Sequence, residues 1–159
     1  MAEAKEVGIG ELLRHLSDLF DKDAERIYAG MDLGVHYRAR YTPIIRAFDG
    51  EPLSIGDLHD RIRVTQGAIS QTVKLMKEAG LLVPVKASDQ RVSRVDLTPL
   101  GREIKARLTA EWELHIGVIS ELEAAIGTPL RAALGETINS LESTSYLDRI
   151  EKKRREANK

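Results

Sequence analysis

Apolar residues recur every three or four positions at both ends of the chain, which is the period of a helix that buries one face. Between residues 8 and 29 this spacing predicts an amphipathic helix that ends near Gly30. Thr98 and Pro99, a pair typical of a helix start, precede a second stripe that predicts one long helix up to Gly127. Its members are Leu100, Ile104, Leu108, Trp112, His115, Ile119, Leu122 and Ile126.

The same pattern predicts a last helix after Thr128 and Pro129. A weaker apolar stripe continues this helix through Tyr146 and Ile150, and the residues Ser-Thr-Ser at 143–145 favour a bend. Its main apolar face consists of Leu130, Leu134, Ile138 and Leu141.

Shorter elements are predicted in the middle of the chain. In the stretch RYTPIIRAF, Pro43 fits the first turn of a short helix that Gly50 closes. Ser54 precedes Asp57 by three residues, which is a variant of the capping-box spacing at a helix N-terminus. The helix predicted there has one apolar face, formed by Ile55, Leu58 and Ile62.

A further helix is predicted directly afterwards. Thr65 can cap it, and Gly80 suits a left-handed C-terminal cap. Its buried stripe is expected to be Ile69, Val73 and Met76. Two helices joined by a tight turn result, which is the arrangement of a helix-turn-helix.

A hairpin is predicted next. The stretches LLVPVKAS and RVSRVDLT are rich in β-branched residues and flank the dipeptide DQ, which predicts two strands packed against the two helices. Pro84 indicates an edge position, because proline cannot donate to a neighbouring strand.

The polar face of the helix after Thr65 is the first candidate for function. Gly67, Ser70, Gln71 and Lys74 fall on the arc opposite the apolar stripe. Amide and hydroxyl groups with little bulk are what a helix needs to read base edges in the major groove of DNA. An ordinary solvated helix face is the alternative, so the neighbouring elements must decide.

Charge is concentrated in the same region. Residues 54–107 carry 10 Lys or Arg and 6 Asp or Glu, a net charge of +4 within a chain of net charge −1. A local positive excess attracts polyanions, although four charges also suit a solvated surface.

Composition and motifs exclude several classes. No apolar run approaches the roughly 20 residues of a membrane span, and the start MAEAKEVGIGE lacks the features of a signal peptide, so we expect a cytoplasmic protein. The absence of cysteine excludes disulfides and thiolate metal sites. The histidines lack metal-binding spacing, and the chain has neither a phosphate loop nor a Gly-x-Ser-x-Gly elbow. We expect no enzymatic activity, no cofactor and no metal site. A metal or proton sensor formed by His36, Asp32 and His115 is the alternative, although nothing in their spacing demands it.

The order of predicted elements resembles that of the MarR family of winged-helix regulators over nearly the whole chain. The stretch LMKEAGLL is similar to the family's junction between recognition helix and sheet. The most specific match is the wing, where the family pattern is met by Asp89, Arg91, Arg94, Leu97, Thr98 and Gly101.

This resemblance implies a mainly α fold with a small β-hairpin, in which a winged helix-turn-helix is flanked by N- and C-terminal dimerisation helices. It implies an N-terminal dimerisation helix in 1–35 and a DNA-binding lobe in 36–100. The long helix and the C-terminal dimerisation helix would occupy 101–159.

The wing resemblance also assigns roles to charged residues. An arginine at a hairpin tip can enter the narrow minor groove, where the potential is negative. By resemblance, Asp89 orients the arginines, Arg91 is the tip contact, and Arg94 is the pairing or backbone-contacting partner. Which arginine has which role stays open, and an incidental surface ion pair is the alternative. The expected DNA-binding residues are Thr65, Gln66, Gly67, Ser70, Gln71, Lys74, Asp89, Arg91 and Arg94.

We therefore expect a sequence-specific regulator of double-stranded DNA that acts as a repressor and binds a pseudo-palindromic operator as a homodimer. A winged-helix module for protein contact is the alternative, and it would need an apolar patch on the recognition face. Burial within one chain is the alternative to dimerisation for the apolar residues Leu12, Leu16, Leu130, Leu134, Ile138 and Leu141.

The family resemblance further implies release from DNA by a small aromatic or anionic ligand, bound between the reading lobe and the dimer helices. Packing in the core or the interface is an equal alternative for the expected wall residues Tyr37, Arg38, Tyr41, Arg46 and Trp112.

Overall fold

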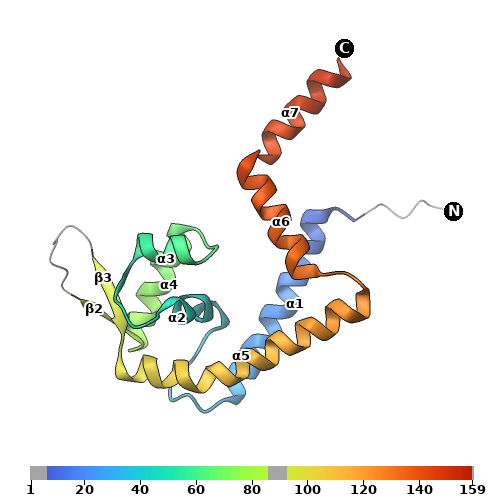
Figure 1. Cartoon of the computed structure of the whole chain (residues 1–159). Helices are drawn as coiled ribbons and strands as arrows, with labels where there is room; N and C mark the ends of the chain where they lie inside the picture. The colour runs from blue at the N-terminus through green and yellow to red at the C-terminus, as the bar shows by residue number, and fades with distance from the viewer. Residues whose placement is uncertain (1–6, 86–92, 159) are drawn as a thin grey trace. The chain divides into compact units, whose positions relative to one another are not determined.

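The computed structural model of the chain describes residues 7–85 and 93–158. The chain divides into two compact units, the first ending at Thr109 and the second beginning at Ala110, inside one long helix. The described elements, labelled in Figure 1, are α1 (Ile9–Gly30), η1 (Ala39–Tyr41), α2 (Thr42–Ala47), β1 (Leu53–Ser54), α3 (Ile55–Arg61), α4 (Gln66–Glu78), β2 (Leu82–Val85), β3 (Arg94–Leu97), α5 (Pro99–Ile126), α6 (Leu130–Ser143) and α7 (Tyr146–Ala157).

The sheet of the first unit is antiparallel, with the strand order β1-β3-β2. Strand β2 is an edge strand, which confirms the position inferred from Pro84. The sequence predicted only the hairpin of β2 and β3. It missed β1, because a strand of two residues, Leu53 and Ser54, is too short to show alternation.

The helix-turn-helix forms as predicted. The side chain of Ser54 accepts a hydrogen bond from the Asp57 N–H (3.0 Å), and the Asp57 carboxylate accepts one from the Ser54 N–H (2.8 Å). This capping box satisfies donors that the first turn of α3 leaves without helical partners. Thr65 caps α4 by accepting from the Ala68 N–H (3.4 Å), and Gly80 ends it with a φ of 73°.

The core of the first unit lies where α2, α3, α4, the sheet and the start of α5 meet. The stripe predicted for α4 is buried, since Ile69, Val73 and Met76 are each less than 5% exposed. The largest fully buried side chains are Phe48, Ile44, Ile45, Leu58, Ile69, Met76, Leu81, Ile104 and Leu108.

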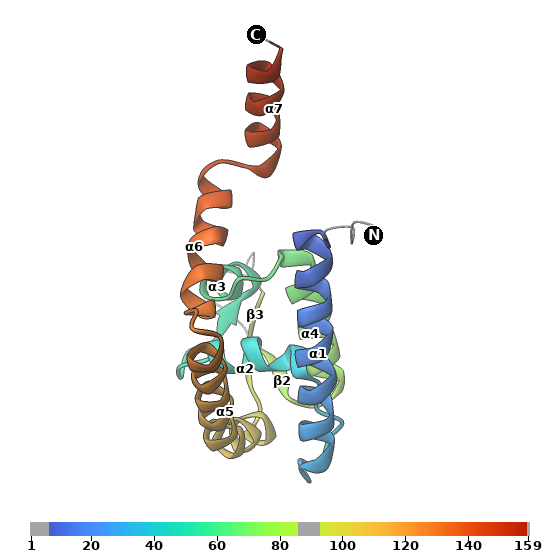
Figure 2. The ribbon, with the colours of Figure 1, turned by 90° about the vertical axis from the view of Figure 1, so that its right-hand side faces the viewer.

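The second unit consists of the rest of α5, then α6 and α7. Gly127 ends α5 with a φ of 65°, as its position in the sequence predicted. Instead of one bent helix, the terminal segment forms two helices (Figure 2). The reason is that Ser145 caps a new helix by accepting from the Asp148 N–H (3.1 Å). Within the described residues, the helices are too short or too polar to cross a bilayer.

A tight contact joins the start of α5 to the residue before β2. A Cβ atom added at Gly101 would lie 2.3 Å from the Leu81 carbonyl oxygen and 3.1 Å from a methyl group of Leu97. The Thr98 hydroxyl donates to the Gly80 carbonyl (2.6 Å) and accepts from the Gly101 N–H (3.0 Å). The absence of a side chain at Gly101 therefore allows the start of α5 to approach the Leu81 backbone this closely.

Gly101→Ala should lower the free energy of unfolding by about 1–3 kcal/mol, because the added methyl group overlaps backbone atoms. Urea denaturation measures the effect. Gly117→Ala is the matched control, because that helical glycine has open space around it and alanine favours a helix by about 1 kcal/mol. A Gly101→Ala protein as stable as the parent would contradict this packing argument.

Candidate nucleic-acid interface

The face of α4 opposite its buried stripe is solvent-exposed. Gly67, Ser70, Gln71 and Lys74 lie on this face, and Gln66, in the first turn of the helix, is exposed as well. We call these five residues the reading face. Thr65 is also exposed, but its hydroxyl serves as the N-cap of α4. The arrangement offers amide, hydroxyl and ammonium groups on a helix whose other side is packed.

Two arginines near the turn between α3 and α4 were missed by sequence reasoning. Arg61 and Arg63 are both exposed. The Arg61 guanidinium donates to the Ala47 carbonyl (2.8 Å) and pairs with Asp49 (2.9 Å), and hydrogen bonding to Arg61 lowers the pKa of Asp49. Arg61 thus links the ends of α2 and α3. The spacing RIRV next to a predicted turn was the available signal.

Only the base of the wing can be described. Asp89 and Arg91 lie outside the described residues, so their assigned roles stay predictions. Arg94 begins β3, and its guanidinium nitrogen donates to the Pro52 carbonyl (2.8 Å) and lies 3.2 Å from the Asp57 carboxylate. Sequence reasoning gave Asp57 only a capping role, and no local pattern connects it with a residue 37 positions away.

The Asp57 carboxylate therefore has two sets of partners. Hydrogen bonds from Ser54 are the largest cause of a lowered pKa of Asp57, and the charges of Arg94 and Arg61 lower this pKa further. The side chains of Arg94 and Asp57 are 40% and 38% exposed, so water screens the attraction between them.

Two of the expected ligand-wall residues, Tyr37 and Tyr41, are packed in the first unit at 3% and 2% exposure. Their rings are in edge contact, with centroids 5.6 Å apart. The Tyr37 hydroxyl lies 3.1 Å from the Thr42 hydroxyl, which donates to Tyr28 (3.2 Å), and burial raises the pKa of Tyr37. These tyrosines connect α1 with the start of α2.

The other expected wall residues are in different surroundings. Arg38 is half-buried, whereas Arg46 is exposed on α2. Trp112 belongs to the second unit and is 7% exposed. A shared role of these residues at a ligand site stays a prediction.

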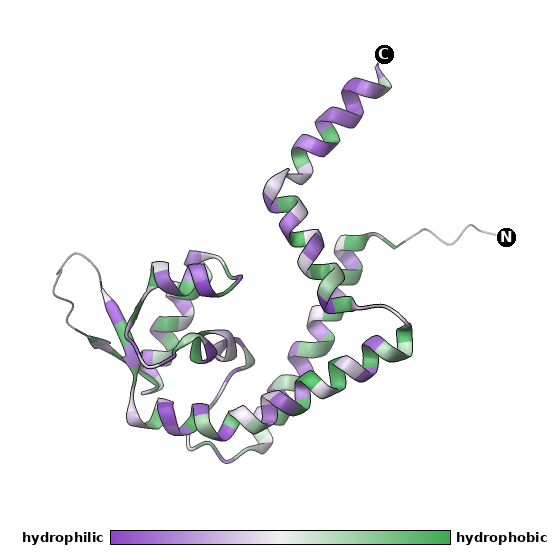
Figure 3. Cartoon of the chain, viewed as in Figure 1, coloured by the Kyte–Doolittle hydropathy of each residue, from purple (hydrophilic) through white to green (hydrophobic). Residues whose placement is uncertain are grey.

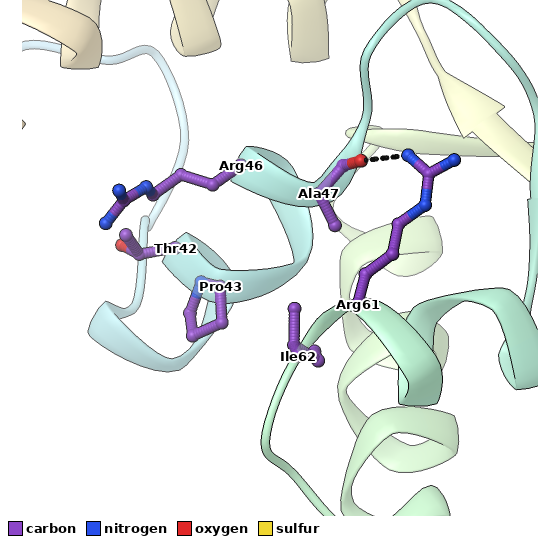
Figure 4. Close-up of a pocket in the computed structure, with 6 residues that line it drawn as sticks. All are labelled: Thr42, Pro43, Arg46, Ala47, Arg61 and Ile62. Carbon is purple, nitrogen blue, oxygen red and sulfur yellow. Dashed lines mark hydrogen bonds between the residues drawn. The ribbon is translucent and has the colours of Figure 1, made fainter. Parts of the chain in front are cut away.

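A hollow of about 380 Å³ lies between α2 and the end of α3. Figure 4 shows Arg46 and Arg61 on different sides of it, with Pro43 and Ile62 between them. Thr42 and Ala47 complete the lining. The hollow thus combines an apolar wall with two arginines, of which Arg61 already pairs with Asp49.

In the part of the chain that the structure describes, no three His, Asp or Glu side chains gather in a group that could hold a metal ion. His115 lies 3.3 Å from the Glu111 carboxylate on α5, so this histidine has an acidic partner one turn away.

Comparison with known proteins adds a family match. Residues 44–101 match the family model described as the winged helix DNA-binding domain. The match begins at the third residue of α2 and ends in the first turn of α5. No curated protein is significantly similar in sequence.

Solved structures resemble nearly the whole chain. The transcriptional regulator MosR of M. tuberculosis in complex with DNA has a TM-score of 0.70 and 18% identity, covering 87% of this chain and 99% of that one. The S. aureus MepR–DNA complex has a TM-score of 0.67 and 18% identity, with 86% and 99% coverage. A MarR/EmrR-family regulator from Acinetobacter sp. ADP1 has a TM-score of 0.67 and 19% identity, with 87% and 100% coverage. MosR and the Acinetobacter protein are both described as transcriptional regulators.

Proposed function

Because the chain has the winged-helix fold of MarR-family transcriptional regulators, with its winged helix DNA-binding domain in residues 44–101, we propose that it is a sequence-specific repressor of transcription. It binds double-stranded DNA as a homodimer on a pseudo-palindromic operator. The single observation that carries this proposal is the exposed reading face of α4. MosR and MepR, which share the fold, have both been solved with DNA.

The chemistry of the reading face favours DNA over a protein partner. Gln71 can form paired hydrogen bonds with adenine, Ser70 can bond to several base edges, and Gly67 allows the backbone to approach. Lys74 supplies charge for a guanine edge or a phosphate. A protein-contact surface of the usual kind would carry aromatic and apolar groups at its centre, and this face carries polar ones.

The terminal helices support the dimer. Leu12 on α1 is 51% exposed, and Ile138 and Leu141 on α6 are 38% and 40% exposed. The second half of α5 adds exposed apolar residues, visible as green segments in Figure 3, whereas α7 is mostly hydrophilic. The exposed apolar residues of α5 include Leu114, Ile116, Val118, Leu122 and Ile126. A single chain leaves this apolar surface in water, and a second copy would cover it.

We also propose control by a small anionic ligand. The buried tyrosines are occupied in packing, so the hollow beside Arg46 is the better candidate for the binding site in the first unit. A ligand releases DNA only by binding the DNA-incompetent state more tightly than the competent one.

The reading face is tested on the operator, obtained by selection from random duplexes. Gln71→Ala and Ser70→Ala should each reduce the preference for operator over random DNA by about 1–3 kcal/mol, and should leave the salt dependence nearly unchanged. Glu78→Ala, at the exposed end of the same helix, should leave the preference intact. Equal affinity of the parent protein for every duplex would contradict the proposed function.

The dimer is tested by light scattering at micromolar concentration, which should give twice the 17.7 kDa of one chain. Leu12→Glu should weaken the dimer, because it places a carboxylate in the apolar face of α1. Arg14→Glu, on the opposite side of α1, should not. A parent protein of monomer mass would exclude the proposed assembly.

Ligand control is tested with a panel of small aromatic acids. At least one should both raise the melting temperature of the free protein and release the operator, and Arg46→Gln should weaken both effects without weakening DNA binding. If none of a broad panel produces both effects, the protein is a constitutive regulator.

A further inference from the structure

Arg94 occupies the position where the wing joins the sheet. It pairs with Val85 across β2 and β3, and with Ser54 across β3 and β1. Among the described residues, Val85 and Arg94 form the end pair of the β2–β3 ladder.

Little backbone pairing holds this end of β3 to the helix-turn-helix. Strand β1, which leads directly into α3, contributes only the two residues Leu53 and Ser54 to the sheet. So short a ladder offers few hydrogen bonds between β3 and the strand that leads into α3, whereas β3 pairs with β2 over four residues. A side-chain contact at the same point can therefore influence the angle between β3 and α3.

The Arg94 side chain makes such a contact. It crosses β1 to reach the Pro52 carbonyl at 2.8 Å and the Asp57 carboxylate at 3.2 Å. The same oxygen of Asp57 accepts the hydrogen bond from the Ser54 N–H. One carboxylate therefore joins the N-terminus of α3, the strand β1 and the first residue of β3.

From this geometry we propose that Asp57 and Arg94 form a positioning clamp that sets β3, and with it the wing, relative to the reading helix. Arg94 acts on DNA binding through Asp57 and not by touching a phosphate. This inference rests on the proposed DNA-binding function and assigns Asp57 a second role besides capping α3.

The direction in which one substitution changes the affinity for DNA distinguishes the clamp from simple electrostatic attraction. Removing an acidic charge from a DNA-binding surface strengthens attraction to phosphate, so Coulomb's law alone predicts that Asp57→Asn binds DNA more tightly. Loss of the clamp predicts weaker binding. Asp60→Asn is the matched control, because Asp60 is an exposed acid on the same helix and the charge change is identical.

The experiment measures affinity for the selected operator at several salt concentrations. Asp57→Asn and Arg94→Gln should each weaken binding by up to about fivefold, the upper end of the coupling for a partly exposed ion pair. The double variant should lose no more than Arg94→Gln alone, because Arg94→Gln already removes the contact with Asp57. In the Asp57→Asn background, Arg94→Gln should leave the salt slope unchanged, whereas a phosphate contact would lower it by about one.

Helix capping is controlled by Ser54→Ala. This variant removes the hydroxyl that accepts from the Asp57 N–H, but it keeps the carboxylate, the Ser54 N–H and Arg94. It should destabilise the protein and leave the operator affinity of the folded dimer unchanged. An equal loss of affinity in Ser54→Ala would assign the effect of Asp57→Asn to the stability of α3 and overturn the clamp.

Failure of the clamp is distinguishable from failure of the proposed function. If the parent protein selects no operator, the function is wrong. If the parent binds its operator and Gln71→Ala weakens that preference, but Asp57→Asn binds as tightly as Asp60→Asn, only the clamp is wrong. Independent, multiplicative losses from Asp57→Asn and Arg94→Gln would overturn it as well.

Discussion

The burial of one face of α4 is the constraint on which the proposed function depends. Ile69, Val73 and Met76 are nearly inaccessible to solvent, which fixes the rotation of the helix about its axis. Because successive residues of an α-helix are separated by about 100°, this rotation leaves Ser70 and Gln71 outside. A rotation by one residue would bury one of these polar side chains and expose part of the core, at a cost of several kcal/mol. Packing thus decides which side chains are available to read DNA.

The surroundings of α4 hold the helix in place from both ends. At its start, Thr65 supplies the cap, and Arg61 links α3 to the end of α2. At its end, Gly80 reverses the chain into β2, and Gly101 lets α5 pack against the Leu81 carbonyl. These contacts are short-range and well defined, so the reading face is presented on a rigid support. Preorganisation of this kind reduces the entropy that binding must overcome.

The features predicted correctly from the sequence are those with local causes. The capping pair of Ser54 and Asp57 and the left-handed Gly80 depend on residues within four positions, and the structure confirms them. The apolar stripe of α4 is equally local. The order of the helices and strands was predicted from turn residues between them and from the family resemblance in the wing.

The features that the sequence did not predict depend on contacts between distant residues. Strand β1 exists because Leu53 and Ser54 pair with Val95 and Arg94, about forty positions away. The pairing of Arg94 with Asp57 is equally remote, whereas the family pattern places a nearer acid, Asp89, five positions before Arg94.

A folded dimer of this chain is expected to recognise a particular DNA sequence. The most direct measurement is selection of duplexes from a random pool by the full chain at physiological salt, followed by sequencing of the retained DNA. The expected result is enrichment of an inverted repeat whose half-sites are about 10 base pairs apart, which matches one reading helix per subunit. Retention of duplexes without any shared sequence would contradict sequence-specific recognition.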